Sequence, residues 1–160
     1  MNIKTAHRAL PALIAACIWA ADQLIKHAVR QVPYDSVLMR VPGVLEITPC
    51  VNTGAAFSML TGRTVLLALL SVALLGAIFV FFMRCTRLRT SSAVALAALV
   101  GGGLGNLTDR VVFGGVTDYI RLLFISFPVF NLADICITCS ILFLILELLT
   151  GRLDPFPEKP

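Results

Sequence analysis

The chain has 160 residues, of which 58% are hydrophobic and only 14% are charged, and its formal net charge is +4. A soluble domain carries about 25% charged residues, so this composition excludes an ordinary soluble protein and indicates an integral membrane protein. The basic balance is interpreted as membrane topology and contact with membrane lipid, not as nucleic-acid binding. There is no internal repeat, low-complexity segment or long linker, so residues 1–160 are expected to form one integral membrane domain.

Four segments are long and apolar enough to cross a bilayer, which takes about 20 residues. They cover about residues 8–29, 64–83, 92–108 and 130–150. The first is the weakest, because Asp22, Gln23 and Lys26 occupy its far end. Its apolar core also has the length of a signal peptide, but no small-residue cleavage site follows it, so a retained span is favoured.

The segment between the first two spans, about residues 30–63, has a different character. Its β-branched residues alternate with proline and glycine, which predicts a small sheet or hairpin over about residues 37–58, lying on the membrane. The expected fold class is therefore an all-α membrane protein with four transmembrane helices and a small β-hairpin on one face.

The loop "RCTRLR" at residues 84–89 indicates which way the chain crosses the membrane. It holds three arginines and no acid, and short loops rich in Lys and Arg stay in the cytoplasm. Two spans precede this loop and two follow it, so both termini are predicted to be cytoplasmic. The segment 30–63 then lies outside, and Asp22, Asp109, Asp118 and Asp134 all lie near the outer membrane interface.

Asp118 in "GGVTDYI" and Asp134 in "FNLADICITC" are the candidate catalytic residues. An acid inside an apolar span costs about 2.5–3.5 kcal/mol. The two aspartates lie 16 positions apart, which leaves room for a loop that brings them together. Two carboxylates held close in a poorly solvated place share a proton, so that one activates water and the other protonates a leaving group. The alternative is that Asp118 is a surface-loop acid and Asp134 a helix N-terminal acid favoured by the helix dipole.

Other polar residues fall at spacings that suit supporting roles. Asn131, Asp134 and Thr138 lie at i, i+3 and i+7, on one helix face. Asp22 and Lys26 lie at i and i+4 and can pair, and for Lys26 a local ion pair that closes the helix end is the simpler interpretation.

The stretch "GGGLGNLTDR" at residues 101–110 combines small and polar residues. Gly101 and Gly105 form a small-xxx-small pair that allows close helix packing. Asn106 and Arg110 can bind substrate carbonyls or the two aspartates, whereas Asp109 and Arg110 can equally form a structural ion pair.

Five motifs occur along the chain in a fixed order: "DQLIK" at 22–26, "NTGAAFS" at 52–58, "GGGLGNLTDR" at 101–110, "GGVTDYI" at 114–120 and "FNLADICI" at 130–137. Together they resemble the motif set of lipoprotein signal peptidase (signal peptidase II), over about residues 10–150. Each motif alone is weak evidence, but five in order are highly specific. One departure is that the stretch between the two aspartate motifs is compact, which bears on the shape of the outer loop.

The resemblance implies a bacterial inner-membrane aspartic endopeptidase that needs no cofactor. Such an enzyme removes the signal peptide of prolipoproteins just before the diacylglyceryl-modified cysteine and is inhibited by cyclic peptide antibiotics such as globomycin. The family's fold is four helices with a small periplasmic β-cradle, and its catalytic pair falls on Asp118 and Asp134, near the periplasmic face. Its substrate- and inhibitor-contacting positions fall on Asn52, Gly102, Asn106, Arg110, Val116 and Asn131. Its first-span acid falls on Asp22, followed by Lys26.

The cysteines suggest neither a disulfide nor a metal site. Only Cys50 lies clearly outside the membrane, and Cys136 and Cys139 share a helix without further ligands nearby, so we expect no metal. Two other classes of function remain open: an ion-coupled transporter with intramembrane carboxylates, and a structural subunit whose acids pair with a partner's basic residues. A transporter needs polar groups along a path through the bilayer, whereas the second span has almost none.

Overall fold

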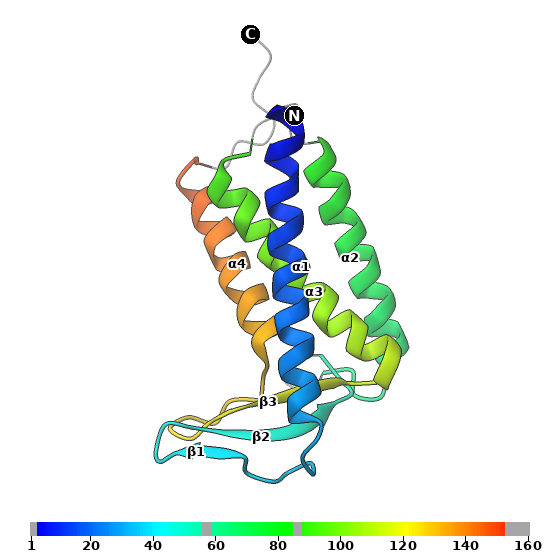
Figure 1. The fold of residues 1–160 in the computed structure, drawn as a ribbon, viewed down its shortest axis with the longest axis vertical. Helices are drawn as coiled ribbons and strands as arrows, with labels where there is room; N and C mark the ends of the chain where they lie inside the picture. The colour runs from blue at the N-terminus through cyan, green and yellow to red at the C-terminus, as the bar shows by residue number, and fades with distance from the viewer. Residues whose placement is uncertain (1–2, 56–58, 85–87, 153–160) are drawn as a thin grey trace.

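Four helices run side by side, and a three-stranded sheet lies across one end of them (Figure 1). The structure is a computed structural model that describes residues 3–55, 59–84 and 88–152, with side chains described from residue 9. In chain order the elements are α1 (Ile3–Val29), β1 (Met39–Val41), β2 (Leu45–Asn52), α2 (Thr64–Arg84), α3 (Thr90–Phe113), β3 (Val116–Leu122) and α4 (Leu132–Leu149). The predicted fold class is thus confirmed.

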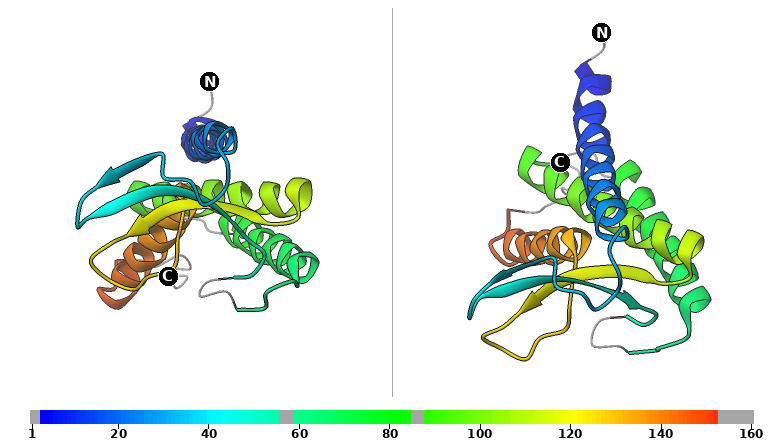
Figure 2. Two further views of the ribbon diagram at one scale, coloured as in Figure 1. Left: turned by 90° about the horizontal axis from the view of Figure 1, so that it is seen from below. Right: turned by 60° about the horizontal axis from the view of Figure 1, so that its bottom comes forward.

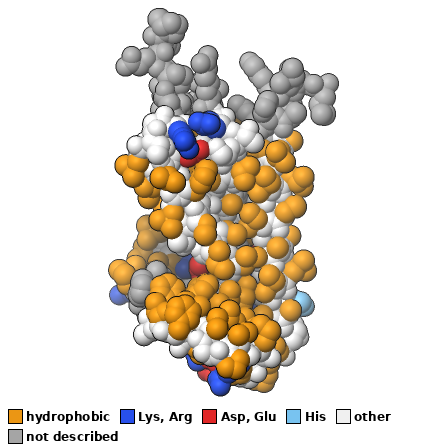
Figure 3. Space-filling view, turned by 90° about the vertical axis from the view of Figure 1, so that its left-hand side faces the viewer, with side chains coloured by type: hydrophobic (Ala, Val, Ile, Leu, Met, Phe, Trp, Pro, Cys, Tyr) orange, Lys and Arg blue, Asp and Glu red, His pale blue; other side chains and the backbone are white. Residues whose placement is uncertain are grey.

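Each helix is long and apolar enough to cross a membrane, over Ala9–Val29, Thr64–Arg84, Thr90–Phe113 and Leu132–Leu149. In the face shown in Figure 3, apolar side chains cover most of the helical part and charged side chains gather mainly near the two ends. The start of α1 and the end of α4 lie at the end opposite the sheet, as an even number of spans requires (Figure 1). The chain is a multi-pass membrane protein.

The third and fourth helices differ in extent from the approximate spans expected from sequence. The third span was expected to end near residue 108 but continues to Phe113, because the polar side chains of its last turns have partners inside the protein. The fourth span was expected to begin at Phe130, yet Phe130 forms an isolated β-bridge with Ile120, and the helix begins at Leu132.

The sheet has strand order β1-β2-β3, and both pairs are antiparallel. The predicted hairpin corresponds to β1 and β2. The third strand was not predicted, since residues 114–120 were expected to lie in a loop. β3 pairs with β2 in a register that places Cys50 opposite Asp118 and Asn52 opposite Val116, with an irregularity between Ile47 and Cys50. A pairing between segments so far apart in sequence leaves no local signal.

Helix α3 is the centre of the bundle and packs against each of the other three helices. Seen from the sheet end, α1 lies on one side of α3 and both α2 and α4 lie on the other (Figure 2). Glycines permit this close approach: a Cβ on Gly102 would lie 2.6 Å from the carbonyl oxygen of Ala133, and one on Gly105 would strike the Asp22 carboxylate. The predicted packing role of the glycines is therefore seen in the contacts between α3 and its neighbours.

Candidate active site

Asp118 and Asp134 come together where β3 meets the start of α4. Asp118 lies in the strand and is 2% exposed, so it is not a surface-loop acid. Asp134 lies in the first turn of α4, where its backbone N–H donates to Asn131 Oδ1 at 2.9 Å and its Oδ2 accepts from the backbone N–H of Asn131 at 3.3 Å. This reciprocal pair is a capping box, so the interpretation of Asp134 as a helix N-terminal acid is correct as far as it goes.

Asn131 joins the two aspartates. Its Nδ2 donates to Asp118 Oδ1 at 2.6 Å, while its backbone and Oδ1 hold Asp134. Asn131 is the cap residue and is fully buried, so both of its hydrogen-bonding ends are fixed by the protein. A single side chain therefore couples the position of one carboxylate to that of the other.

Two further amides donate to the carboxylates. Asn52 Nδ2 lies 3.0 Å from Asp118 Oδ2, and Asn106 Nδ2 lies 2.7 Å from Asp134 Oδ1. The oxygen of each amide is occupied as well: Asn52 Oδ1 accepts from the backbone N–H of Gly54 at 2.9 Å, and Asn106 Oδ1 accepts from Lys26 at 2.9 Å. These contacts fix the orientation of both amides and aim their N–H groups at the carboxylates.

A buried charged network lies behind Asn106. Lys26 and Asp22 are both fully buried and lie 2.9 Å apart, so the expected pair within α1 forms. Lys26 also approaches Asp109 Oδ2 at 3.5 Å, and Arg30 lies 2.6 Å from Asp109 Oδ1. Asp109 therefore pairs with α1, and not with Arg110 as one interpretation had it. The Asp22 carboxylate also accepts from the backbone N–H of Ala133 at 3.1 Å, which ties α1 to the start of α4.

The pKa of the Asp118 carboxyl group is strongly shifted. Burial, followed by the negative charge of Asp134, raises the pKa of Asp118 to about 7, although hydrogen bonds from Asn52 and Asn131 act in the opposite direction. A carboxyl group with this pKa exists in both protonation states near neutral pH, as a group that gives and takes protons requires.

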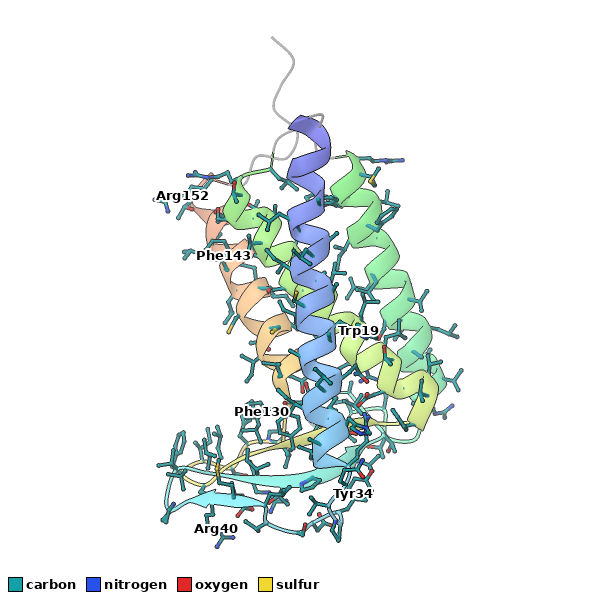
Figure 4. All side chains as sticks on the ribbon, in the orientation of Figure 1. Trp19, Tyr34, Arg40, Phe130, Phe143 and Arg152 are labelled. Carbon is teal, nitrogen blue, oxygen red and sulfur yellow. The ribbon has the colours of Figure 1, made fainter. Side chains whose placement is uncertain are left out.

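A groove of about 440 Å³ opens onto the two aspartates. Most of its wall is apolar and comes from the segment Phe127–Phe130 and from one face of α4. Figure 4 shows Phe130 where the chain passes from the sheet into α4. The residues that line the groove include Asn52, Asn106, Arg110, Val116, Asp118, Asp134, Ile135, Ile137, Thr138 and Cys139. The groove can therefore hold an apolar chain whose polar part lies against the carboxylates.

All but one of the site residues expected from sequence fall into two groups, and the exception is Gly102. Those that line the groove are Asn52, Asn106, Arg110, Val116, Asp118 and Asp134. Asn131, Asp22, Lys26 and Asp109 lie behind it, fully buried, and reach it through hydrogen bonds. Gly102 packs against the backbone of α4 and is absent from the groove lining. Arg110 donates to the carbonyl oxygen of Gly54 at 3.3 Å and has no ion pair with a described residue. The part of "NTGAAFS" at residues 56–58 lies outside the described residues.

Sequence reasoning missed Arg30 and Tyr119. Arg30 donates to Thr117 Oγ1 at 2.8 Å as well as to Asp109, and its guanidinium lies 3.9 Å from the centroid of the Phe113 ring. The hydroxyl of Tyr119 accepts from the backbone N–H of Leu132 at 3.2 Å and so holds the start of α4. A signal for Arg30 existed, because Asp22, Lys26 and Arg30 continue one stripe at spacings of four.

Comparisons with known proteins agree on one family. A family model described as signal peptidase (SPase) II matches residues 14–150. A lipoprotein signal peptidase of Streptococcus thermophilus is 36% identical over 141 residues, which is 88% of this chain and 92% of the relative. Another, of Dehalococcoides mccartyi, is 39% identical over 141 residues, covering 86% of this chain and 87% of the relative. A solved structure of a bacterial membrane enzyme, determined by the in meso method at 2.3 Å resolution, matches with a TM-score of 0.85 at 28% identity and covers 95% of this chain and 94% of that one.

Proposed function

Because the chain belongs to the signal peptidase II family, whose members are peptidases, we propose that it removes the signal peptides of prolipoproteins by an aspartic mechanism that uses Asp118 and Asp134. The observation that carries the proposal is the single buried side-chain amide of Asn131, which donates to the Asp118 carboxylate and accepts from the backbone N–H of Asp134. The raised pKa of Asp118, to about 7, supports it further.

In the proposed reaction, one aspartate is ionised and the other is protonated. The ionised carboxylate takes a proton from a water molecule as the water oxygen bonds to the scissile carbonyl carbon. The protonated carboxyl group gives its proton to the amide nitrogen as the C–N bond breaks. The products are a new carboxyl terminus on the signal peptide and a free amine on the remaining protein. Asn52, Asn106 and Asn131 hold the carboxylates in place throughout.

The proposed substrate carries a diacylglyceryl group on the cysteine just after the scissile bond. The groove supports this choice because it is largely apolar and opens along α4, where an apolar signal segment and lipid chains can lie beside membrane lipid. The same groove is the proposed site of inhibition by cyclic peptide antibiotics such as globomycin.

We further propose that the protein lies in the bacterial inner membrane with both termini in the cytoplasm. The aspartates lie at the sheet end of the bundle, opposite the end at which α2 stops at Arg84 (Figure 1). If the acid-free loop 84–89 is cytoplasmic, the active site lies near the periplasmic face. This is the depth at which the lipidated cysteine of an inserted substrate is expected.

The transporter alternative has less support. The polar groups of the site lie at one end of the bundle, and α2 contains only Thr64, Ser71 and Arg84 as polar or charged residues. At the other end, the carboxylate of Glu147 is held by the hydroxyls of Ser91 and Ser92. Between the two polar clusters, α3 has only apolar residues and glycines over residues 93–105, and α4 has only the hydroxyls of Thr138 and Ser140 besides two cysteines. The described residues thus offer few polar groups for an ion path.

The experiment that tests the function uses purified protein in detergent and a synthetic lipopeptide. One peptide carries the diacylglyceryl cysteine, and its control carries the same sequence with an unmodified cysteine. Cleavage of the first just before the cysteine, identified by mass spectrometry, supports the proposal. Ion flux in reconstituted vesicles without cleavage of either peptide would support the transporter instead.

A further inference from the structure

Thr138, like Arg110, is a polar groove residue to which the proposed mechanism gives no role. It lies one turn beyond Asp134 on α4 and lines the same groove. The other groove residues with side-chain nitrogen or oxygen atoms all have hydrogen-bond partners in the protein. These are Asn52, Asn106, Arg110, Asp118 and Asp134. The Thr138 hydroxyl has none among the residues that the structure describes.

A threonine hydroxyl in a helix usually bonds to the carbonyl of the preceding turn. Two helix hydroxyls here do so, Ser71 to Leu67 and Thr108 to Leu104, and the cap residue Thr150 bonds likewise to Leu146, each at 2.8 Å. Among the described residues, the hydroxyls of Thr138 and Ser140 on α4 do not, and of these two only Thr138 lines the groove. The Thr138 side chain is exposed in the largely apolar groove. A hydroxyl that loses water there without gaining a partner is costly, so this group is available for a polar group of whatever enters the groove.

A bound substrate supplies the missing partner. A peptidase acts on an extended chain, because a helix hides its carbonyl groups in its own hydrogen bonds. When the end of a signal helix unwinds in the groove, its backbone N–H and C=O groups lose their partners and must find others. The α4 residues that line the groove beside Thr138 cannot serve as strong hydrogen-bond partners, since they are Ile135, Ile137 and Cys139. The hydroxyl of Thr138 can.

The position of Thr138 specifies which part of the substrate it meets. Four residues of helix rise about 6 Å, which equals about two residues of extended chain. Thr138 lies deeper in the helix than Asp134, on the side from which a signal peptide approaches. We propose that the Thr138 hydroxyl binds a backbone group of the signal peptide two or three residues before the scissile bond and so positions the unwound segment. This inference rests on the proposed function and adds a substrate-positioning residue to it.

The first test compares Thr138→Val, which keeps the shape and removes the hydroxyl, with wild type and with Thr138→Ser. The value of kcat/KM on the lipopeptide should fall about three- to tenfold in Thr138→Val, the size of one neutral hydrogen bond, and Thr138→Ser should restore most of it. The matched control is Ser140→Ala, because Ser140 lies on the same helix, is buried and is absent from the groove lining. Its kcat/KM should stay within about twofold of wild type, because the Ser140 side chain does not line the groove.

The second test replaces single amides of the lipopeptide by esters. An ester at the second or third residue before the scissile bond should lower kcat/KM for wild type and have no further effect on Thr138→Val, whereas an ester five residues before it should act equally on both. The melting temperature of Thr138→Val should equal or exceed that of wild type.

Three results would overturn the inference: unchanged kcat/KM in Thr138→Val, additive effects of the ester and the substitution, or a loss of activity that follows a lower melting temperature. Full activity in Asp118→Asn would instead refute the proposed function, so the two failures are distinguishable.

Discussion

The ammonium group of Lys26 lies 2.9 Å from Asn106 Oδ1, and the opposite end of that amide lies 2.7 Å from Asp134. An ammonium group only donates hydrogen bonds, so it determines which end of Asn106 faces it. If the amide turned over, its N–H groups would face the lysine and its oxygen would face the carboxylate. A residue of α1 that does not line the groove therefore fixes the hydrogen bond that Asp134 receives.

We predict that Lys26→Met strongly impairs both stability and activity. The substitution leaves Asp22 and Asp109 buried, with one cation fewer between them, and removal of one member of a buried pair costs about 3–5 kcal/mol. Differential scanning fluorimetry in detergent measures the stability, and the lipopeptide assay measures the activity. Arg40→Met is the matched control, because Arg40 is 56% exposed and its partner Glu46 retains Arg121 at 3.1 Å. The control should lose at most about 1 kcal/mol. Equal effects in the two variants would contradict the role given to Lys26.

Asp118→Asn and Asp134→Asn are each expected to abolish cleavage of the diacylglyceryl lipopeptide. An amide can neither take a proton from water nor give one to the leaving nitrogen, and general acid–base catalysis contributes about 10²–10⁴-fold. Both proteins should still insert into the membrane and be purified in a folded form. Asp35→Asn serves as the control, since Asp35 is an exposed acid outside the groove lining, and it should keep wild-type turnover. Near-normal turnover in either active-site variant would show that the assignment is wrong.

The stability of the protein should depend on pH through Asp118. Its pKa rises from an ordinary value of 3.8 to about 7 on folding. Below about pH 4 the group is protonated in both states; between pH 4 and 7 the unfolded chain releases a proton that the folded protein keeps. Wild type should therefore lose stability relative to Asp118→Asn as the pH rises from 4 to 7, and the difference should level off above about pH 8. Melting temperatures of both proteins across this range test the prediction, and parallel curves would refute it.

Chelators, serine-directed reagents and cysteine-directed reagents are expected to leave the activity intact. Within the described ranges, no three His, Cys, Asp or Glu side chains are grouped as metal ligands. Modification of Cys50 could affect activity indirectly, because Cys50 lies opposite Asp118 in the sheet. Burial raises the pKa of its thiol to about 11, so the thiol is neutral at pH 7.5 and reacts slowly.

A Cys50→Ala variant completes this test. If an alkylating reagent inhibits wild type but spares the variant, the inhibition arises from a modified side chain beside Asp118 and the aspartic mechanism stands. Activity that a chelator removes and zinc restores would refute that mechanism.

The parts of the fold that depend on local composition were predictable. The number of helices follows from apolar length, and the β1–β2 hairpin follows from β-branched residues between turn residues. The strand β3 was not predictable from its own residues, because its partner β2 precedes it by two helices. The start of α4 was placed two residues too early, since an apolar Phe130 extends the hydrophobic run although Asn131 is the residue that caps the helix.

Within the site, the motifs pointed to the groups that meet in space but not to their contacts. Asp22 and Lys26 were recognised as a pair from their spacing within one helix. That spacing does not predict the hydrogen bond from Lys26 to Asn106 or the one from the backbone of Ala133 to Asp22. Arg30 was overlooked because it follows the apolar span and resembles an ordinary interfacial arginine. The geometry of α1 against α3 gives it a buried partner in Asp109. Tertiary contacts of this kind depend on packing between helices, which one sequence does not specify.

The contact between Asp22 and the backbone of Ala133 also has a consequence for biosynthesis. Asp22 belongs to α1 and Ala133 to α4, which is synthesised after the other three helices, so the two meet only once α4 has joined them. Until then Asp118 lacks its neighbours Asn131 and Asp134, and the groove wall that α4 forms is missing. A chain whose synthesis stops before α4 therefore lacks Asp134, and under the proposed mechanism it is an inert product in the membrane rather than an unregulated protease.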